Sequence, residues 1–267
     1  MPASLDSIVS ATRKRVSESR RGADLRALER KAAAHQPRGF REHLHRTGAS
    51  KPAIIAELKK ASPSKGLIRA EFRPSELALE LEQAGAAALS VLTDEEFFQG
   101  SLAYLEQASA ATSLPCLRKD FMVDEFQILE SRAHGADAIL LIVAALEQKE
   151  IIAFGRAARA QELDVLCEVH DETELQRALD AGCDLIGVNS RDLKTFHVDL
   201  ATTFRLGEKV PSGCVRVAES GIHSGADVAQ LRSAGYDAFL IGESLMRAAR
   251  PGEALVKLLD EARVVVS

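Results

Sequence analysis

The sequence predicts an α/β fold, a (β/α)₈ TIM barrel with an N-terminal helical extension. From about residue 52 onward, short apolar segments alternate with longer segments of helical periodicity, the pattern of parallel strands joined by crossover helices. Hydrophobic residues make up 46% of the chain but aromatic residues only 4%, so the core must come from Ala, Val, Ile and Leu, which suit buried parallel strands. A length of 267 residues fits one such barrel, because these barrels commonly have about 250 residues.

Eight strands are expected in the barrel. Their predicted ranges are 53–58, 87–92, 115–119, 138–143, 164–169, 185–189, 215–219 and 238–241. Helical patterns lie between them, including 75–84, 124–134, 171–181 and 225–234. Each of these four helices is followed by a glycine, a residue favoured just after a helix end. Because the junction recurs at near-regular intervals, a repeating βα fold explains it better than chance.

Residues 1–50 do not follow this alternation. They are rich in Arg, Lys, Ala and Glu, with amphipathic stretches at 5–16 and 25–34, so we expect helices that lie across the barrel. The chain is accordingly divided into an extension at 1–50 and a catalytic barrel at 51–267, which together form one structural domain. A doubly wound open sheet is the alternative, but no G-x-G-x-x-G motif follows the first strand, as dinucleotide-binding sheets of that kind require.

Charge and hydropathy narrow the range of partners. The net charge is −5 with both signs dispersed, so the surface has no broad attraction for nucleic acid or anionic lipid. The longest apolar run, at 138–146, is far shorter than the roughly 20 residues that span a bilayer, and the N-terminus lacks the apolar segment of a signal peptide. We therefore expect a cytoplasmic protein that binds a small molecule, and no protein partner is implied.

The four cysteines, Cys116, Cys167, Cys183 and Cys214, are scattered through apolar segments. They form no CxxC pair and have no pair of histidines nearby, so neither a zinc site nor a disulfide framework is indicated. We expect them to be buried and reduced, and we expect no metal.

Polar residues gather where the predicted strands end, which is where barrel enzymes have their active sites. The candidates are Glu57, Lys59, Lys119, Glu168, Asn189, Arg191 and Glu219. Any one of them could equally be a solvated rim residue, but charges inside a barrel are costly unless they are paired, so the set indicates a function. Asp120, His170 and Asp192 are expected in rim or capping roles, and His170 followed by Asp171 is interpreted as a strand end and helix cap.

The last two strands end in a pattern typical of phosphate binding. Ser220 and Gly221 follow the seventh strand, and Gly242 and Glu243 follow the eighth, where the phosphate site of such barrels usually lies. The alternative is that the glycines only make tight turns. The loop after the first strand contains Ser62 and could fold over the same phosphate, or could be only a loop.

Six segments resemble motifs of the indole-3-glycerol-phosphate synthase family. They are IAELKKASPSKG at 55–66, LRKDF at 117–121, CEVH at 167–170, GVNSRDL at 187–193, AESGI at 218–222 and IGESLM at 241–246. The first is highly specific, whereas the last two recur in other phosphate-binding barrels. The sequence departs from the family at Gln99-Gly100, where two glycines are expected.

The resemblance implies a cofactor-free lyase of tryptophan biosynthesis. Its phosphorylated substrate would be 1-(2-carboxyphenylamino)-1-deoxyribulose 5-phosphate, closed to indole-3-glycerol phosphate with loss of CO₂ and water. Lys119 would protonate the sugar ketone, with its charge held by Glu57, and Glu168 would transfer a proton later. Lys59 would pair with the anthranilate carboxylate or protonate the departing hydroxyl. The sequence does not decide which of these acid roles belongs to Lys59 and which to Lys119.

The remaining implied roles concern binding. Asn189 would orient the sugar hydroxyls or the carboxylate, Arg191 would buttress that side, and Glu219 would order the polar network. The implied phosphate ligands are Ser62, Ser220, Gly221, Gly242 and the backbone N–H of Glu243. The implied ring slot is Phe98, Phe121 and Leu140, although each of these could be ordinary core.

Two rival functions remain open from sequence. A phosphoribosylanthranilate isomerase is another phosphate-binding barrel, but it would need an Asp and Cys acid/base pair where this chain has Glu57, Lys59 and Lys119. A non-catalytic sensor of a phosphorylated ligand would keep the phosphate loops without any need for lysines paired with carboxylates.

Overall fold

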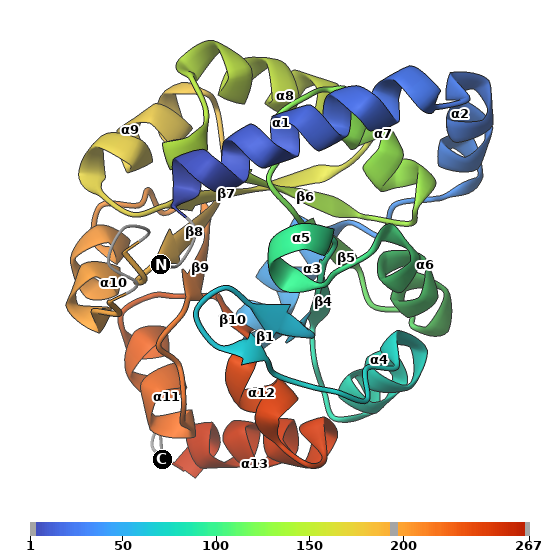
Figure 1. The fold of residues 1–267 in the computed structure, drawn as a ribbon. Coiled ribbons are helices and arrows are strands. Elements are labelled where there is room, and N and C mark those ends of the chain that lie inside the picture. Colours follow the sequence, from blue (N-terminus) through green and yellow to red (C-terminus); the bar gives the residue numbers. More distant parts are fainter. Residues whose placement is uncertain (1–3, 193–196, 265–267) are drawn as a thin grey trace.

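The computed structural model describes residues 4–192 and 197–264, so Leu193 of the fourth motif lies outside the described residues. Eight parallel strands close into a barrel in the order β1-β10-β9-β8-β7-β6-β5-β4 (Figure 1). Their bounds are β1 Ala53–Leu58, β4 Ala88–Leu92, β5 Cys116–Lys119, β6 Ala138–Ile142, β7 Asp164–Val169, β8 Leu185–Asn189, β9 Val215–Glu219 and β10 Ala238–Ile241. The predicted barrel is confirmed, and each expected strand lies within one residue of its observed bounds.

The helices cover the outside of this barrel. They are α4 Pro74–Gln83, α6 Leu102–Ala111, α7 Phe126–Ala133, α8 Gln148–Ala160, α9 Glu172–Asp180, α10 Leu200–Gly207, α11 Gly225–Ser233 and α13 Pro251–Val264. Shorter elements lie in the loops: β2 Ala61–Ser62, β3 Gly66–Leu67, α5 Glu95–Phe98, the 3₁₀ turn Val143–Ala145 and α12 Glu243–Arg247. The four predicted junction glycines all have positive φ, which confirms them as left-handed ends of helices.

Strand alternation separates two apolar layers and decides what points inward. One cluster packs between the strands and the surrounding helices, and a second fills the inside of the barrel. The inner cluster includes Ile55, Leu117, Leu166 and Val217, which lie on barrel strands one, three, five and seven. Because side chains of a strand alternate in direction, the residues two positions later on these strands also point inward.

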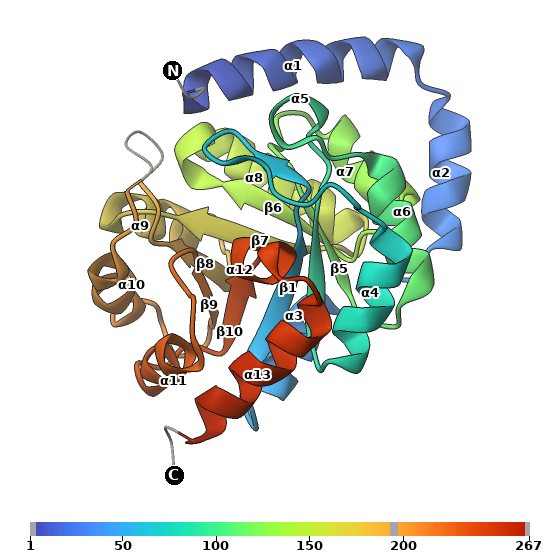
Figure 2. The same cartoon turned by 60° about the horizontal axis from the view of Figure 1, so that its bottom comes forward.

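The extension consists of three helices: α1 Leu5–Gly22, α2 Leu25–Ala34 and α3 Phe40–Gly48. Figure 2 shows α1 crossing one end of the barrel and α2 running down its side. At the opposite end α3 plugs the barrel, because Phe40 and Leu44 belong to its inner cluster. At the end covered by α1, Arg15 forms ion pairs with Asp94 at 3.2 Å and Asp120 at 3.4 Å. The predicted helices at 5–16 and 25–34 are confirmed, and the first continues to Gly22.

The backbone at Gln99-Gly100, where the family resemblance predicts two glycines, shows which of the two positions needs a glycine. Gln99 adopts φ 50°, in the left-handed region that glycine occupies more readily. Gly100 must be glycine, since a Cβ there would overlap the carbonyl oxygen of Leu92. The turn after α5 therefore keeps its shape with one glycine, at some backbone strain in Gln99.

The expectation that all four cysteines are reduced is wrong for two of them. Cys167 and Cys183 form a disulfide, with Cα atoms 6.5 Å apart, while Cys116 and Cys214 are free. Cys167 points outward from β7, opposite in direction to Glu168, and meets the segment between α9 and β8. The two positions are 16 residues apart with no motif between them, so their contact follows from the βα packing rather than from a cysteine pattern.

A buried ion pair fastens the extension to the amino ends of the strands. Asp137 is fully buried and accepts hydrogen bonds from the Arg38 guanidinium at 2.6 and 2.9 Å and from the Arg38 backbone N–H at 2.7 Å. Although burial opposes ionisation, the hydrogen bonds from His35 and Arg38 hold the pKa of Asp137 below its usual value. The carboxylate is therefore charged and depends on Arg38.

Arg38→Ala should destabilise the fold by about 3 kcal/mol, because it leaves the buried Asp137 charge uncompensated. Urea denaturation measures this, with Arg26→Ala on the exposed face of α2 as the control. The turnover number of folded protein should stay unchanged, since this end of a barrel serves stability. A loss below about 0.5 kcal/mol, the range of neutral surface changes, would contradict the assignment.

Candidate active site

A cavity of about 200 Å³ opens at the carboxyl ends of the strands, beneath α1. Every site residue predicted from sequence lines this cavity except Gly242. Glu243, the next residue in the chain, and Glu57, which packs against Gly242, both line it. The lining residues predicted from sequence are Glu57, Lys59, Ser62, Phe98, Lys119, Phe121, Leu140, Glu168, Asn189, Arg191, Glu219, Ser220, Gly221 and Glu243. The predicted convergence in space is therefore confirmed, although the role of each residue is a separate matter.

Four charged side chains form one layer across the barrel. Glu57, Lys119, Glu168 and Glu219 come from strands one, three, five and seven, each two residues beyond an apolar residue of the inner cluster. Alternate strands contribute the four side chains of a layer in barrels of this class. The charged layer thus lies directly above an apolar one, which keeps water away from below.

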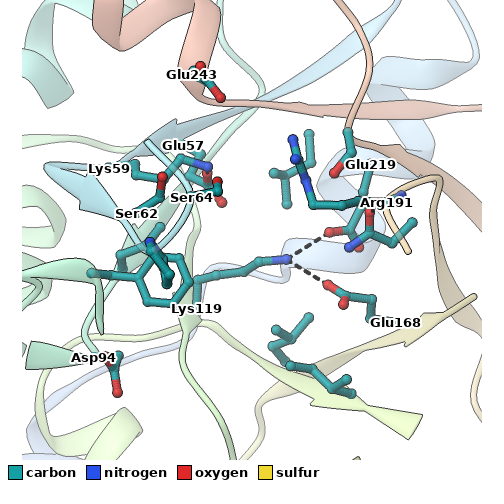
Figure 3. Close-up of a pocket in the computed structure, with 18 of the residues that line it drawn as sticks. Glu57, Lys59, Ser62, Ser64, Asp94, Lys119, Glu168, Arg191, Glu219 and Glu243 are labelled. Carbon is teal, nitrogen blue, oxygen red and sulfur yellow. Dashed lines mark hydrogen bonds and ion pairs between the residues drawn. The ribbon is translucent and has the colours of Figure 1, made fainter. Parts of the chain in front are cut away.

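Lys119 bridges two of these carboxylates (Figure 3). Its Nζ lies 2.9 Å from Glu168 Oε2 and 2.7 Å from Glu219 Oε2, and it donates a hydrogen bond to each. All three side chains are almost fully buried. Glu219 fits beside β8 because residue 187 is glycine, since a Cβ there would overlap Glu219 Oε1.

This arrangement separates the proton affinities of the two carboxylates. Burial alone would lower the pKa of Lys119, but the charges of Glu168, Glu219 and Glu57 outweigh burial and hold it above its usual range. Burial also opposes ionisation of Glu168, yet Lys119 and His170 hold its pKa well below the usual value. In Glu219, by contrast, burial raises the pKa to about 7, with Lys119 opposing the rise and Glu168 adding to it. At neutral pH the site therefore holds a charged lysine, an ionised Glu168 and a Glu219 poised to exchange a proton.

Glu57 helps to hold the charge of Lys119, as expected, but it is not a direct partner of the lysine. Glu57 instead forms an ion pair with Lys59, two residues along the same strand. Strands β1 and β7 are each separated from β5 by one strand, so strand order does not decide between Glu57 and Glu168; Lys119 turns toward Glu168, and Glu219 reaches it from β9 across the barrel. Glu57 raises the pKa of Lys119 only through its charge.

The loops after β9 and β10 approach the cavity with unusual backbone geometry. Ser220 and Gly221 both have positive φ, at 66° and 72°. Gly242 has φ −130° and so needs no glycine for its turn, but a Cβ there would overlap Glu57. Close approach, rather than a tight turn alone, therefore explains Gly242, and Glu243 begins α12 beside it.

The opposite side of the cavity carries its large apolar side chains, next to Asp94 and Asp120. Phe98 after β4, Phe121 after β5 and Leu140 on β6 line it, with the two ring centroids 6.4 Å apart. Leu5 and Ile8 of α1 complete this side from above. Because β4, β5 and β6 lie across the barrel from β9 and β10, the cavity has one end with these apolar side chains and an opposite end formed by the loops that contain Ser220-Gly221 and Glu243.

Asn189 and Arg191 lie at the end of β8, between these two sides. The backbone N–H of Arg191 donates to Asn189 Oδ1 at 3.0 Å, and Arg191 forms an isolated β-bridge with Val198. This bond fixes the orientation of the Asn189 amide at the edge of the cavity.

Asp120, expected in a rim or capping role, is a buried part of the site, and His170 lies directly behind the site. Asp120 lines the cavity and accepts hydrogen bonds from Thr93 at 2.7 Å and Arg118 at 3.1 Å. His170 directly follows β7 and Asp171 caps α9, as predicted, but His170 also contacts Glu168. Sequence spacing could have revealed His170, since it stands two residues after Glu168 and so shares its face of the strand. Asp94 also lines the cavity and was not predicted, because no spacing from a predicted strand-end residue singles it out.

Two features are absent from the part of the chain that the structure describes. In residues 4–192 and 197–264, no group of His, Cys, Asp and Glu side chains is placed to hold a metal ion. No helix in these ranges combines the length and apolarity needed to cross a membrane.

Together, the closed barrel and the paired lysines and glutamates at its strand ends define an enzyme of the (β/α)₈ class. Solved structures share this fold: the Streptococcus mutans protein named KGPDC matches with a TM-score of 0.64 at 14% identity, over 81% of this chain and 99% of that one. Thiamine phosphate pyrophosphorylase from Pyrococcus furiosus matches with a TM-score of 0.61 at 17% identity, over 80% and 97%. At such low identity these likenesses show the fold alone.

Sequence comparison is more specific. The family described as indole-3-glycerol phosphate synthase matches residues 5–258. The enzyme of that name from Koribacter versatilis is 56% identical over 97% of this chain and 100% of its own length, and that of Burkholderia vietnamiensis is 49% identical over 95% and 98%. The chain therefore belongs to the indole-3-glycerol phosphate synthase family, decarboxylating lyases of tryptophan biosynthesis.

Glu219 should titrate near pH 7 in the ligand-free protein, since burial raises its pKa to about 7. A folded-state pKa above the usual 4.5 means that its contribution to stability is present below 4.5 and is lost as the pH rises to about 7. The stability of Glu219→Gln relative to the wild type should therefore increase across this range. Carbon-13 NMR of glutamate-labelled protein should show one resonance with that midpoint.

The resonance should disappear in Glu219→Gln and persist in Glu208→Gln, which changes an exposed glutamate. If no glutamate resonance titrated above pH 6, the electrostatic description of the layer would be contradicted.

Proposed function

We propose that this cavity closes 1-(2-carboxyphenylamino)-1-deoxyribulose 5-phosphate to indole-3-glycerol phosphate, releasing CO₂ and water. The observation that carries the proposal is the position of Lys119, a buried ammonium between an apolar end and an end formed by the loops after β9 and β10. A substrate with an aromatic ring at one end and a phosphate at the other fits that polarity. Its ketone would then lie near the middle, where Lys119 is.

Ring closure requires a proton donor at the ketone. As the anilino ring attacks, negative charge develops on the ketone oxygen, and a charged lysine in a dry cavity can stabilise it and donate a proton. Lys119 fits this role because its two glutamates keep it charged and fix its Nζ. Protonation turns the ketone oxygen into the hydroxyl that later leaves as water.

The later steps need a base and a second acid. After CO₂ departs, the hydroxyl leaves as water and a proton is removed from carbon to complete the aromatic ring. Glu168 suits that removal, because its lowered pKa leaves it ionised at neutral pH and able to accept a proton, and because it lines the cavity. Lys59 suits the carboxylate or the departing hydroxyl, since its pairing with Glu57 holds it at the cavity. Glu219 keeps Lys119 in place and orders the network.

Binding is assigned by position in the cavity. The phosphate would accept hydrogen bonds from the backbone and hydroxyl groups at Ser62, Ser220, Gly221, Gly242 and Glu243. Asn189 and Arg191 would hold the sugar hydroxyls or the carboxylate. Phe98, Phe121 and Leu140 would hold the aromatic ring, with Leu5 and Ile8 of α1 excluding water from above.

The surrounding assignments follow from this chemistry. Acid–base groups of the chain suffice for each step, so the proposed reaction uses no cofactor. The dispersed charge and the small cavity favour a small phosphorylated substrate over nucleic acid, and nothing in the site requires a protein partner. We further propose that the enzyme works in the cytoplasm, and that the extension at 1–50 and the barrel form one structural domain, held together by pairs such as Arg38 and Asp137.

Lys119→Met should abolish turnover while leaving the dissociation constant for substrate within roughly tenfold, because the lost interaction belongs mainly to the transition state. The assay follows indole fluorescence on addition of the carboxyphenylamino-deoxyribulose phosphate. Lys60→Met is the matched control, since Lys60 lies next to the site but contacts Tyr104. Wild-type turnover in Lys119→Met would remove this residue from the mechanism.

Ser220→Ala should raise the Michaelis constant by about tenfold through loss of one hydrogen bond to a charged phosphate, with little change in turnover number. Steady-state kinetics measure both constants, and Ser212→Ala on the exposed surface serves as the control. An unaltered Michaelis constant would count against the phosphate assignment.

A further inference from the structure

A line of alternating charges continues from the cavity into the protein behind it. Starting at the cavity, it runs from Glu219 through Lys119 to Glu168, and then through His170 to Glu174 on α9. Lys119 holds Glu168 Oε2, whereas His170 Nε2 lies 3.4 Å from the other oxygen, Oε1. The two oxygens of Glu168 thus face different cations.

His170 is held rigidly but stays outside the cavity. Glu174 Oε2 accepts hydrogen bonds from both the backbone N–H of His170, at 2.8 Å, and its ring Nδ1, at 3.0 Å. Its Nε2 is buried and faces Glu168. Because His170 is not among the residues that line the cavity, it can act on substrate only through Glu168.

We propose that His170 is a positioning residue that gives Glu168 a second, permanent cation, so that Glu168 remains an aligned base when Lys119 releases its proton. The inference rests on the proposed function, in which Lys119 is the acid and Glu168 the base. It adds a reason why one chain can use the two groups in succession although they form an ion pair with each other.

The reason is electrostatic. When Lys119 donates its proton it becomes neutral, and Glu168 loses the positive charge on Oε2. A buried carboxylate without a cation takes up a proton readily and is then no longer a base. A charged imidazole on Oε1 prevents this, because it does not take part in the first proton transfer.

The surroundings of His170 keep it charged. Burial lowers its pKa, but Glu168 from β7 and Glu174 from α9 face its two ring nitrogens and together raise the pKa to about 10. Glu168 and Glu174 thus together keep His170 charged, and His170 adds to Lys119 in keeping Glu168 ionised. Although the charges form a continuous row, only Lys119 and Glu168, which line the cavity, exchange protons with substrate.

The test compares turnover number and Michaelis constant across pH for two variants. His170→Leu removes both the charge and the hydrogen-bond donor, so the turnover number at neutral pH should fall roughly tenfold. The acid limb of its pH–rate profile should move to higher pH by about one pH unit or more. The Michaelis constant should change less than the turnover number, because the phosphate and ring contacts remain. His170→Gln restores a donor without charge, so it should recover part of the turnover but keep the shifted limb.

Two controls separate this effect from structural damage. His45→Gln changes an exposed histidine at the far end of the barrel and should match the wild type. Should His170→Leu fail to fold, Glu174→Gln tests the same idea, since it weakens the charge on His170 and should raise the acid limb in the same direction. Glu172→Gln is its matched control on the same helix, where Glu172 pairs with Lys209 instead.

The outcomes also distinguish the inference from the proposed function. If Glu168→Gln loses activity while His170→Leu keeps the wild-type pH profile, the inference about His170 is overturned and the proposed function is not. The same holds for Glu174→Gln where that variant is used. Full activity in Glu168→Gln would overturn the role of Glu168 and with it the proposed mechanism. Equal changes in turnover number and Michaelis constant, without a shift of the limb, would also overturn the positioning role.

Discussion

Lys119 can remain charged inside the barrel only because two glutamates meet it there. Transferring an ammonium group out of water is expensive, and the attraction of nearby carboxylates compensates only when the geometry is close. Here both contacts are below 3 Å and the partners come from separate strands, so the lysine is fixed from two directions. Removing either glutamate would change both the charge and the position of the group proposed to start the reaction.

This constraint explains features elsewhere in the barrel. The charged residues occupy one layer because strands one, three, five and seven each place a side chain at that level. Small residues on the intervening strands make room for them, since Gly187 lies against Glu219 and Gly242 against Glu57. Helix α1 covers the cavity with Leu5 and Ile8, which lowers the dielectric around the charges and strengthens their interactions. Fold, packing and chemistry thus depend on the same alternation of strands.

The sequence predicted the barrel and the membership of the site well, because both follow from local patterns. Strand periodicity locates Glu57 and Glu168 at strand ends, and closure of the barrel brings those ends together. Partner choice was predicted less well: Lys119 binds Glu168 and Glu219 rather than Glu57, since side-chain reach across a barrel depends on tilt and register. The Cys167–Cys183 disulfide was missed for a similar reason, because two scattered residues meet only in the packed structure.

The most direct test of the account is a crystal structure with the product, indole-3-glycerol phosphate, bound in the cavity. We expect the phosphate to contact residues 220–221 and 242–243, the indole ring to lie between Phe98, Phe121 and Leu140, and Lys119 Nζ to stay near the bond formed in ring closure. A product bound in the reverse direction, or outside the layer of Glu57, Lys119, Glu168 and Glu219, would contradict the account.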